Sequence, residues 1–326
     1  MIHLTDAIMM NRKRTEVKDV AEYTPMMQQY LKTKEEYKDC ILFYRLGDFY
    51  EMFFDDAIVV SKELELTLTG KSCGAEERAP MCGVPYHAVE GYLNKLVANG
   101  HKVAICEQVE DPKLAKGLVK REVIRIVTPG TNTDMQALDE SKNNYIMCIV
   151  YLADKYGISL ADISTGDYFV TEVDTERKLI DEINKFAPSE IICNESFYMS
   201  GVDLSDMKNR LGIAVYSLEA WYFSDETAEN TLKDHFKVQS LEGLGLSDYA
   251  CGTIAAGALL RYLYETQKND LGNLSAIHPY STGKYMIIDS STRRNLELVE
   301  TLREKQKRGS LLWVLDKTKT AMGART

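Results

Sequence analysis

Two side chains separated by one residue, Phe49 and Glu51, carry the most unusual chemistry in this sequence. They lie in the run Gly47-Asp48-Phe49-Tyr50-Glu51, which apolar residues follow. In an extended strand, residues i and i+2 point to the same face. An exposed ring beside a carboxylate can wedge between nucleic-acid bases and hydrogen-bond the base that it disturbs. Because an aromatic ring in an apolar strand usually belongs to a core, the pair alone does not separate a binding surface from a core strand.

Four other segments of distinctive sequence surround this pair. They are residues 24–31, 80–89, 103–108 and 127–131. In this order and spacing, together with residues 47–57, these segments closely resemble the amino-terminal part of MutS, a family of bacterial DNA mismatch-recognition proteins.

The resemblance continues to the end of the chain. Residues 289–298, 308–316 and 322–325 are similar to the start of the core domain of that family. Residues 145–275, between these better-marked flanks, are similar mainly in pattern. The chain stops inside a motif that the family continues as a helix, so we expect an amino-terminal fragment.

The resemblance implies an α/β multidomain fold. A mixed α/β mismatch-recognition domain would be followed by a ribonuclease-H-like α/β connector domain and by the start of a helical core domain. The expected parts are a mobile N-terminal arm (1–22), the mismatch-recognition domain (23–132), a linker (133–144), the connector domain (145–274) and the truncated start of the core or lever domain (275–326). Met1, Met9 and Met10 are alternative starts of the protein.

Hydrophobic periodicity and turn residues predict the elements of the first domain. The expected helices are 25–38, 57–66 and 88–98, and a left-handed cap at Asn99-Gly100 ends the last of them. The expected strands are 41–54 with a break near Gly47, short strands within 67–85, and strands at 102–109 and 119–127.

Three runs of strand-like sequence predict an antiparallel meander at the start of the second domain. They are residues 146–152, 158–162 and 168–173. The elements expected after them are a helix at 177–186, a strand at 190–193, and helices at 227–236 and 247–267. This order is similar to that of the connector domain. The core is expected to begin with a strand at 285–288 and a helix at 293–304.

By the resemblance, Phe49 stacks on a mispaired base and Glu51 hydrogen-bonds the same base. Inserting an apolar side chain between base steps requires unstacking and bends the duplex. A mismatched pair has already lost stacking and pairing energy, so DNA would be selected by its deformability and not by a code of base edges. Phosphates would repel the Glu51 carboxylate, which would weaken binding to matched duplex.

Lys71 lies in a run, Gly70-Lys71-Ser72, that mimics the end of a P-loop. The full pattern requires glycine at the position that Glu65 occupies, so we reject a nucleotide site here. A contact between Lys71 and a DNA phosphate and simple solvent exposure remain the two interpretations.

His87, Lys120 and Arg121 are the other candidates for contacts with the DNA backbone or with loops. His87 follows a turn-rich segment, and an isolated histidine more often serves packing or hydrogen bonding than ligand binding. Lys120 and Arg121, with Arg125, offer a modest basic face along a strand. Solvated charges are the alternative interpretation of that face.

A ribonuclease-H-like domain raises a rival function, that of a metal-dependent nuclease. Such an enzyme needs several carboxylates that converge on magnesium. Asp154, Asp162 and Asp167 lie in or beside the predicted strands, but Asp162 alone has a persuasive strand-interior position. We therefore expect no catalytic residue and no metal site. A second alternative is a member of the same family with another DNA substrate, against which Phe49 and Glu51 argue.

Charge and composition limit the possible partners and compartments. The net charge is −10, and residues 1–130 hold 18 basic against 20 acidic residues, whereas the remainder holds 21 against 29. Any DNA binding should therefore be weak and sensitive to salt. Seven cysteines without a CxxC pair, together with the lack of a membrane-length apolar run or a signal-peptide core, favour a cytoplasmic, nucleoid-associated protein.

The family implies further partners and cofactors. Mismatched double-stranded DNA is the expected ligand, and MutL is expected to contact the connector domain. Whole members of the family dimerise and use ATP and magnesium. Because this sequence contains no P-loop, we expect the chain itself to bind no cofactor, to hydrolyse no ATP and to contact no membrane.

Overall fold

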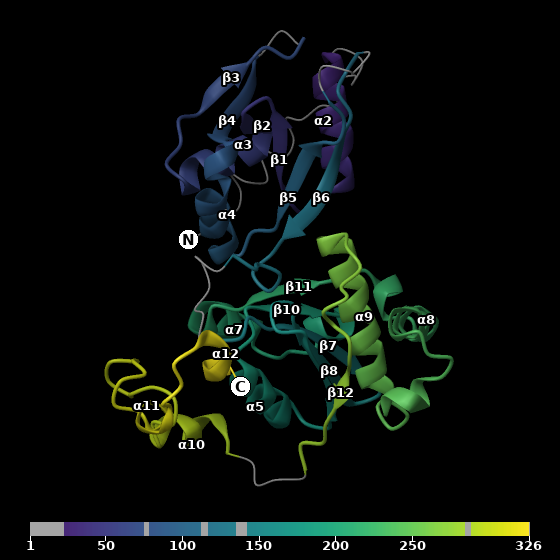
Figure 1. Cartoon of the computed structure of the whole chain (residues 1–326), viewed down its shortest axis with the longest axis vertical. Coiled ribbons are helices and arrows are strands. Elements are labelled where there is room, and N and C mark those ends of the chain that lie inside the picture. The colour runs from purple at the N-terminus through teal and green to yellow at the C-terminus, as the bar shows by residue number, and fades with distance from the viewer. Residues whose placement is uncertain (1–22, 75–77, 112–116, 135–141, 284–287, 326) are drawn as a thin grey trace. The chain divides into compact units, whose positions relative to one another are not determined.

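The structure is a computed structural model that describes residues 23–74, 78–111, 117–134, 142–283 and 288–325. The chain divides into two compact units, Met1–Leu96 with Lys102–Ile124 and Val97–His101 with Arg125–Thr326 (Figure 1). The predicted arm at 1–22 lies outside the described residues. So do residues 135–141 of the predicted linker and residues 285–287 of the predicted strand.

The first unit is built on a mixed sheet that positions the residues of interest. Its strands are β1 (Ile41–Leu46), β2 (Phe49–Phe53), β3 (Thr69–Lys71), β4 (Ala79–Pro85), β5 (Val103–Gln108) and β6 (Arg121–Val127). They lie in the order β3-β4-β2-β1-β5-β6. β1 is parallel to β5 and antiparallel to β2, and β4 is antiparallel to both β2 and β3. The predicted break near Gly47 is a turn, in which Gly47 has a φ of +59°.

Helices pack on this sheet close to their predicted positions. They are α2 (Pro25–Glu36), α3 (Phe54–Glu63) and α4 (Val89–Ala98), and the 3-10 turn η2 (Tyr86–Ala88) precedes α4. The predicted left-handed cap after α4 is confirmed, since Gly100 has a φ of +84°. α3 begins three residues earlier than predicted, because Asp55 and Asp56 place negative charge in its first turn, where the helix dipole favours it.

The second unit contains the predicted meander. Its strands are β7 (Ile146–Leu152), β8 (Lys155–Asp162), β9 (Asp167–Val173), β10 (Glu190–Cys193), β11 (Ala214–Ser217) and β12 (His278–Pro279). They lie in the order β11-β10-β7-β8-β9-β12, with β7, β8 and β9 antiparallel and β10 and β11 parallel to β7. The predicted ribonuclease-H-like arrangement of the connector is therefore confirmed.

Both faces of the second sheet are covered by helices, which gives three layers (Figure 1). These helices are α5 (Glu176–Phe186), α6 (Glu195–Tyr198), α7 (Leu204–Leu211), α8 (Asp225–Phe236) and α9 (Ala250–Gln267). One core cluster joins β7 and β9 to α9, and a second joins the other face of β7 and β8 to α5. α9 is largely buried, as predicted. Within the described residues, no helix is both long enough and apolar enough to cross a membrane.

The residues that follow β6 are attached to the second unit. Glu190 is fully buried, and its Oε2 accepts hydrogen bonds from the Thr128 hydroxyl and, at 2.9 Å, from the Gly130 N–H. Its Oε1 accepts a hydrogen bond from the Tyr262 hydroxyl at 2.7 Å. A buried carboxylate is tolerated when its oxygens are bonded in this way. Residues 128–131, predicted to end the first domain, therefore pack with the second unit.

The second sheet also extends past residue 274, where the connector domain was predicted to end. β12 pairs in parallel with β9. Beyond it, the Tyr280 N–H donates to the Val170 carbonyl at 2.9 Å, and the Thr171 hydroxyl donates to the Tyr280 carbonyl at 2.7 Å. Long-range pairing of this kind leaves no local signal in the sequence.

Short helices replace the predicted helix 293–304. They are α10 (Ser290–Asn295), α11 (Leu311–Leu315) and α12 (Ala321–Arg325). Asp289 caps α10 by accepting a backbone hydrogen bond at 2.7 Å, and Glu297 then takes a left-handed φ of +49°. Leu296 and Leu302 stay 61% and 45% exposed. The prediction was wrong because no described element buries the apolar side that would stabilise a longer helix.

Substitution of Gly257 tests the contact between α8 and α9. A Cβ at this position would lie 2.3 Å from the Cα of Ala228, so Gly257→Ala should lower the free energy of unfolding by about 1–3 kcal/mol. Gly243→Ala is the control, because a Cβ there meets no atom within 4 Å. Urea denaturation measures both variants. An equal effect of the two substitutions would contradict the close helix contact.

Buried thiols predict a loss of stability at high pH. None of the seven cysteines forms a disulfide and all are buried. Burial raises the pKa of Cys40 and Cys106 to about 12 and that of Cys82 to about 11, from an ordinary value of 9.0. Because the folded pKa values are the higher ones, the contribution is complete below pH 9 and is lost as pH rises through the folded values.

The free energy of unfolding should therefore be lower at about pH 10.5 than at about pH 8, and Cys40→Ala should reduce that difference by about 2 kcal/mol. Urea denaturation at the two pH values measures the effect. Because buried tyrosines add to the same trend, the comparison of Cys40→Ala with the unmodified chain isolates one thiol. An unchanged difference would contradict the role of Cys40.

Candidate functional site

The ring of Phe49 stands at the open end of β2. Its exposed fraction is 47%, whereas Phe53 at the other end of the strand is 1% exposed. The two residues share one face because they are four positions apart. α2 covers that face over Phe53, where the Tyr30 hydroxyl donates to the Phe53 carbonyl at 3.4 Å and the two ring centres lie 4.9 Å apart. On this face, β2 is therefore buried at Phe53 and exposed at Phe49.

The neighbouring strands determine the direction of Phe49 and Glu51. Phe49 pairs with Leu46 of β1 and Pro85 of β4, and Glu51 pairs with Gly83 of β4. Gly83 has no side chain, so the Glu51 side chain occupies the space above it. A Cβ on Gly83 would lie 3.5 Å from the Cγ of Glu51. The extended backbone places Phe49 and Glu51 on one face, as their spacing predicted.

Glu51 forms an ion pair with Lys71 on the same face. The Nζ of Lys71 lies 2.5 Å from the Oε2 of Glu51, and their side chains are 32% and 17% exposed. Lys71 ends β3, which β4 separates from β2. The Lys71 Nζ also lies 5.6 Å from the centre of the Phe53 ring. The structure therefore brings together two residues that the sequence placed in separate segments. We call the face that carries Phe49, Glu51 and Lys71 the wedge face.

A charged cluster supports the hairpin on the other face of the sheet. The Arg45 guanidinium lies 3.8 Å from the centre of the Tyr86 ring, 3.4 Å from the Glu107 carboxylate and within hydrogen-bond distance of the Gly47 carbonyl. Tyr50 donates a hydrogen bond to Glu107. Burial, and then this carboxylate, raise the pKa of the Tyr50 hydroxyl. The cluster fixes the backbone on both sides of the turn that precedes Phe49.

The sequence prediction did not include Arg45 and Glu107 among the site residues. One signal was present, since Arg45 is a charged residue inside the apolar run 41–46. A charged side chain in such a run needs a partner when it is partly buried. Nothing local in the sequence indicates that the partner is Glu107, 62 positions further along the chain.

The other predicted contact residues differ in their surroundings. His87 is exposed in η2, and its ring meets that of Tyr86 edge to face at 5.8 Å. Lys120 is exposed and paired with Glu122, whose carboxylate raises the pKa of the lysine. Arg121 is half-buried and donates to the Arg45 carbonyl at 2.8 Å. The Arg121 guanidinium is therefore already engaged inside the first unit.

The three predicted acidic residues of the second unit do not meet at one point. Asp162 and Asp167 are opposite each other in the pairing of β8 with β9, whereas Asp154 lies at the other end of β8. Asp162 is buried, and it accepts hydrogen bonds from the Asn144 N–H at 2.9 Å and from the Ser164 N–H and hydroxyl at 2.7 Å each. Asp154 precedes β8, whereas Asp162 ends that strand. A magnesium-dependent nuclease would need these carboxylates together. In the described residues, no three His, Cys, Asp or Glu side chains form a group that could hold a metal ion.

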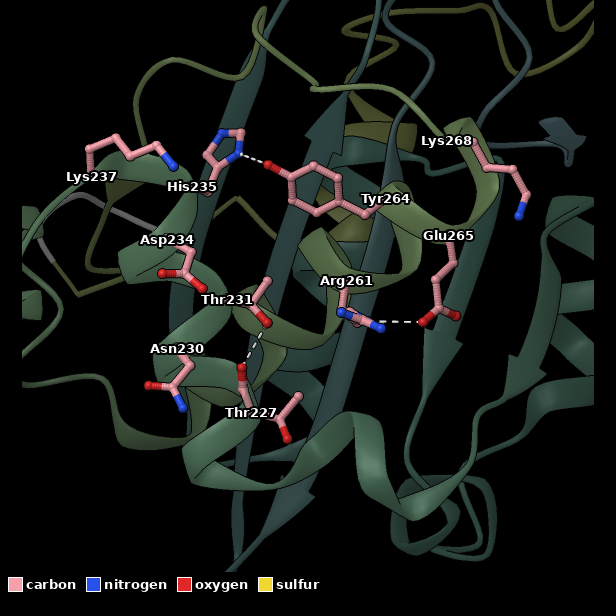
Figure 2. Close-up of a pocket in the computed structure, with 10 residues that line it drawn as sticks. All are labelled: Thr227, Asn230, Thr231, Asp234, His235, Lys237, Arg261, Tyr264, Glu265 and Lys268. Carbon is pink, nitrogen blue, oxygen red and sulfur yellow. Dashed lines mark hydrogen bonds and ion pairs between the residues drawn. The ribbon is translucent and has the colours of Figure 1, made fainter. Parts of the chain in front are cut away.

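A polar pocket of about 720 Å³ lies between α8 and α9 in the second unit (Figure 2). His235 bridges the Tyr264 hydroxyl at 2.6 Å and the Leu274 carbonyl at 2.7 Å, and Arg261 pairs with Glu265 at 2.9 Å. These polar groups bond to one another and hold the two helices together. No sequence motif indicated this pocket, because the residues that line it are spaced as in ordinary helices, in the two segments 227–237 and 261–268.

The fold and the site define a multidomain α/β protein that presents an aromatic ring and a paired carboxylate on one strand, followed by a ribonuclease-H-like domain. The MutS family has the same succession of domains. The family models of MutS domain I, MutS domain II and MutS domain III match residues 24–136, 144–275 and 291–326. The chain belongs to the MutS family.

Curated relatives are similar over the same span. The DNA mismatch repair protein MutS of Lachnoclostridium phytofermentans is 69% identical over 306 residues. Those of Ruminiclostridium cellulolyticum and Acetivibrio thermocellus are each 54% identical, over 305 and 310 residues. The alignments cover 93–94% of this chain and 33–35% of the relatives. The chain thus spans about a third of the length of the curated relatives it matches.

The contrast between Phe49 and Phe53 can be tested by two matched substitutions. Phe53→Ala removes a buried ring and should lower the free energy of unfolding by about 3–5 kcal/mol. Phe49→Ala removes a half-exposed ring from the same face and should change it by only about 0.5 kcal/mol. Urea denaturation compares the two variants. A loss from Phe49→Ala as large as that from Phe53→Ala would show that Phe49 belongs to the core.

Proposed function

We propose that this chain recognises mismatched double-stranded DNA in mismatch repair. The observation that carries the proposal is the half-exposed ring of Phe49 beside the Glu51 carboxylate on a strand that is otherwise buried. In this proposal, Phe49 enters the base stack at a mispair or a small loop, and Glu51 hydrogen-bonds the mispaired base. The names of the relatives and the match to MutS domain I support this assignment.

The physical basis of selectivity is the deformability of the DNA. A wedge must separate two stacked base pairs, and the loss of stacking is smaller where pairing is already disturbed. The ring then recovers part of this energy by stacking on the displaced base. The pairing of β2 with β1 on one side and β4 on the other supports the proposal. An inserted Phe49 ring has to keep its direction while the duplex bends, and a strand paired on both sides keeps it.

Backbone contacts would hold the duplex against the wedge face. His87 and Lys120 remain proposed contacts. Lys71 and Arg121 would contribute mainly through their positive charge, because Lys71 is paired with Glu51 and the Arg121 guanidinium bonds inside the unit. Phosphate contacts set register and affinity and carry no sequence information. With a net charge of −10 for the chain, these contacts would yield weak binding that falls steeply with salt.

Membership of the MutS family also suggests a role for the second unit. In the proposed whole protein, the connector domain relays the state of the mismatch site to an ATPase and contacts MutL, and two copies of the protein associate. The match to MutS domain II supports this part of the proposal. None of these roles requires Asp154, Asp162 or Asp167 to act in catalysis.

The wedge can be tested by DNA binding at low ionic strength. We expect the chain to bind a duplex with one unpaired thymine more tightly than the matched duplex, and Phe49→Ala to weaken binding to the bulged duplex by about tenfold or more, because stacking on one base is worth about 1–3 kcal/mol. Fluorescence anisotropy with labelled duplexes measures both affinities. Ile58→Ala, at a 48% exposed position on α3, is the control for loss of an exposed apolar side chain.

Two outcomes would contradict the proposal. Equal binding of the two duplexes, unchanged by Phe49→Ala, would remove Phe49 as the residue that detects the mispair. The absence of binding to either duplex at micromolar protein would show that the chain does not recognise mismatches by itself.

A further inference from the structure

The ion pair between Glu51 and Lys71 adds an electrostatic element to the proposed mismatch site. It connects β2 to β3 across β4, with 2.5 Å between the Lys71 Nζ and the Glu51 Oε2. We propose that Lys71 is a positioning residue for Glu51: it holds the carboxylate on the wedge face and compensates its charge, so that Glu51 can meet a mispaired base. The inference rests on the proposed function, because it concerns the same site.

The surroundings of Glu51 leave Lys71 as the group that directs its side chain. On β4, Gly83 offers space and no polar side chain. On β1, the opposite residue is Tyr44, whose hydroxyl already donates to Gln29 at 2.6 Å. The carboxylate therefore leans across Gly83 to reach Lys71. Without this partner, nothing else described on the two flanking strands would keep the carboxylate beside Phe49.

Burial makes compensation of the charge important. The Glu51 side chain is 17% exposed and the Lys71 side chain 32%, so both charges have lost part of their hydration. A carboxylate in that position is costly without a partner. It would also face the phosphates of an approaching duplex. Lys71 removes the net negative charge from the wedge face and leaves the Phe49 ring as its protruding group.

A positioning role differs from a simple phosphate contact in one measurable respect. A lysine that only binds phosphate strengthens the binding of matched and mismatched duplexes by the same factor. A lysine that positions Glu51 strengthens binding mainly where a base can bond to Glu51. The informative quantity is therefore the discrimination ratio, the Kd of the matched duplex divided by that of the duplex with one unpaired thymine.

The experiment is a double-mutant cycle on the whole chain. Anisotropy at low salt yields the discrimination ratio for the unmodified chain, Lys71→Gln, Glu51→Gln and the double variant. We expect Lys71→Gln to lower the ratio about fivefold when Glu51 is present and less than about twofold in the Glu51→Gln background, since neighbouring residues in one network are not additive.

Two further variants are controls. Lys71→Arg retains the positive charge and should keep the ratio within about twofold of the unmodified chain. Lys62→Gln removes the same charge from an exposed position on α3 and should leave the ratio unchanged. Circular dichroism and thermal midpoints establish that each variant is folded before its binding is compared.

Each alternative outcome has one meaning. If Lys71→Gln weakens both duplexes equally and leaves the ratio unchanged, Lys71 is a phosphate contact and the inference is overturned, while the proposed function stands. If the ratio falls equally with and without Glu51, Lys71 acts independently of Glu51, which also overturns it. A ratio of one for the unmodified chain would refute the proposed function, and the inference with it.

Discussion

The candidate site depends on one constraint, the pairing of β2 with a strand on each side. β4 pairs with all of β2 and β1 pairs with its residues 49–51, and Met52 and Phe53 are buried at its far end. An isolated hairpin of this size would be marginal in water. An exposed phenyl ring also gives up about 1.5–3 kcal/mol that burial would provide. Only a strand stabilised elsewhere can keep Phe49 in solvent and in a fixed direction.

Ion pairs lie on both faces of the sheet near the hairpin, although the chain as a whole is acidic. A chain with a net charge of −10 repels a polyanion overall. Near the hairpin, however, Glu51 is paired with Lys71 and Glu107 with Arg45. The Glu51–Lys71 pair compensates negative charge on the wedge face, where the proposed ligand would approach, and the Glu107–Arg45 pair does the same on the opposite face. They also connect β2 and the preceding turn to β3 and β5. The same ion pairs therefore compensate the charges and hold the hairpin in place.

Much of the fold could be predicted from the sequence. The elements that were predicted wrongly depend on burial against distant parts of the chain. The three strands within 146–173 were predicted to within three residues, because short apolar runs separated by short turns indicate strands that are buried on both faces. The turn at Gly47 and the cap at Gly100 were predicted because glycine tolerates positive φ. The predicted helix 293–304, by contrast, is replaced by short helices, since helix stability comes mostly from tertiary burial.

For this protein, the sequence by itself determined the strand periods, the turn positions, the reduced cysteines and the segments that place the chain in the MutS family. Tertiary structure alone decided that Phe49 is exposed while Phe53 on the same face is buried, because α2 covers one end of β2 and not the other. It alone decided that Lys71 meets Glu51, because the strand order β3-β4-β2 brings them together. Local sequence does not encode which distant segments pair, since that choice depends on the burial available to the whole sheet.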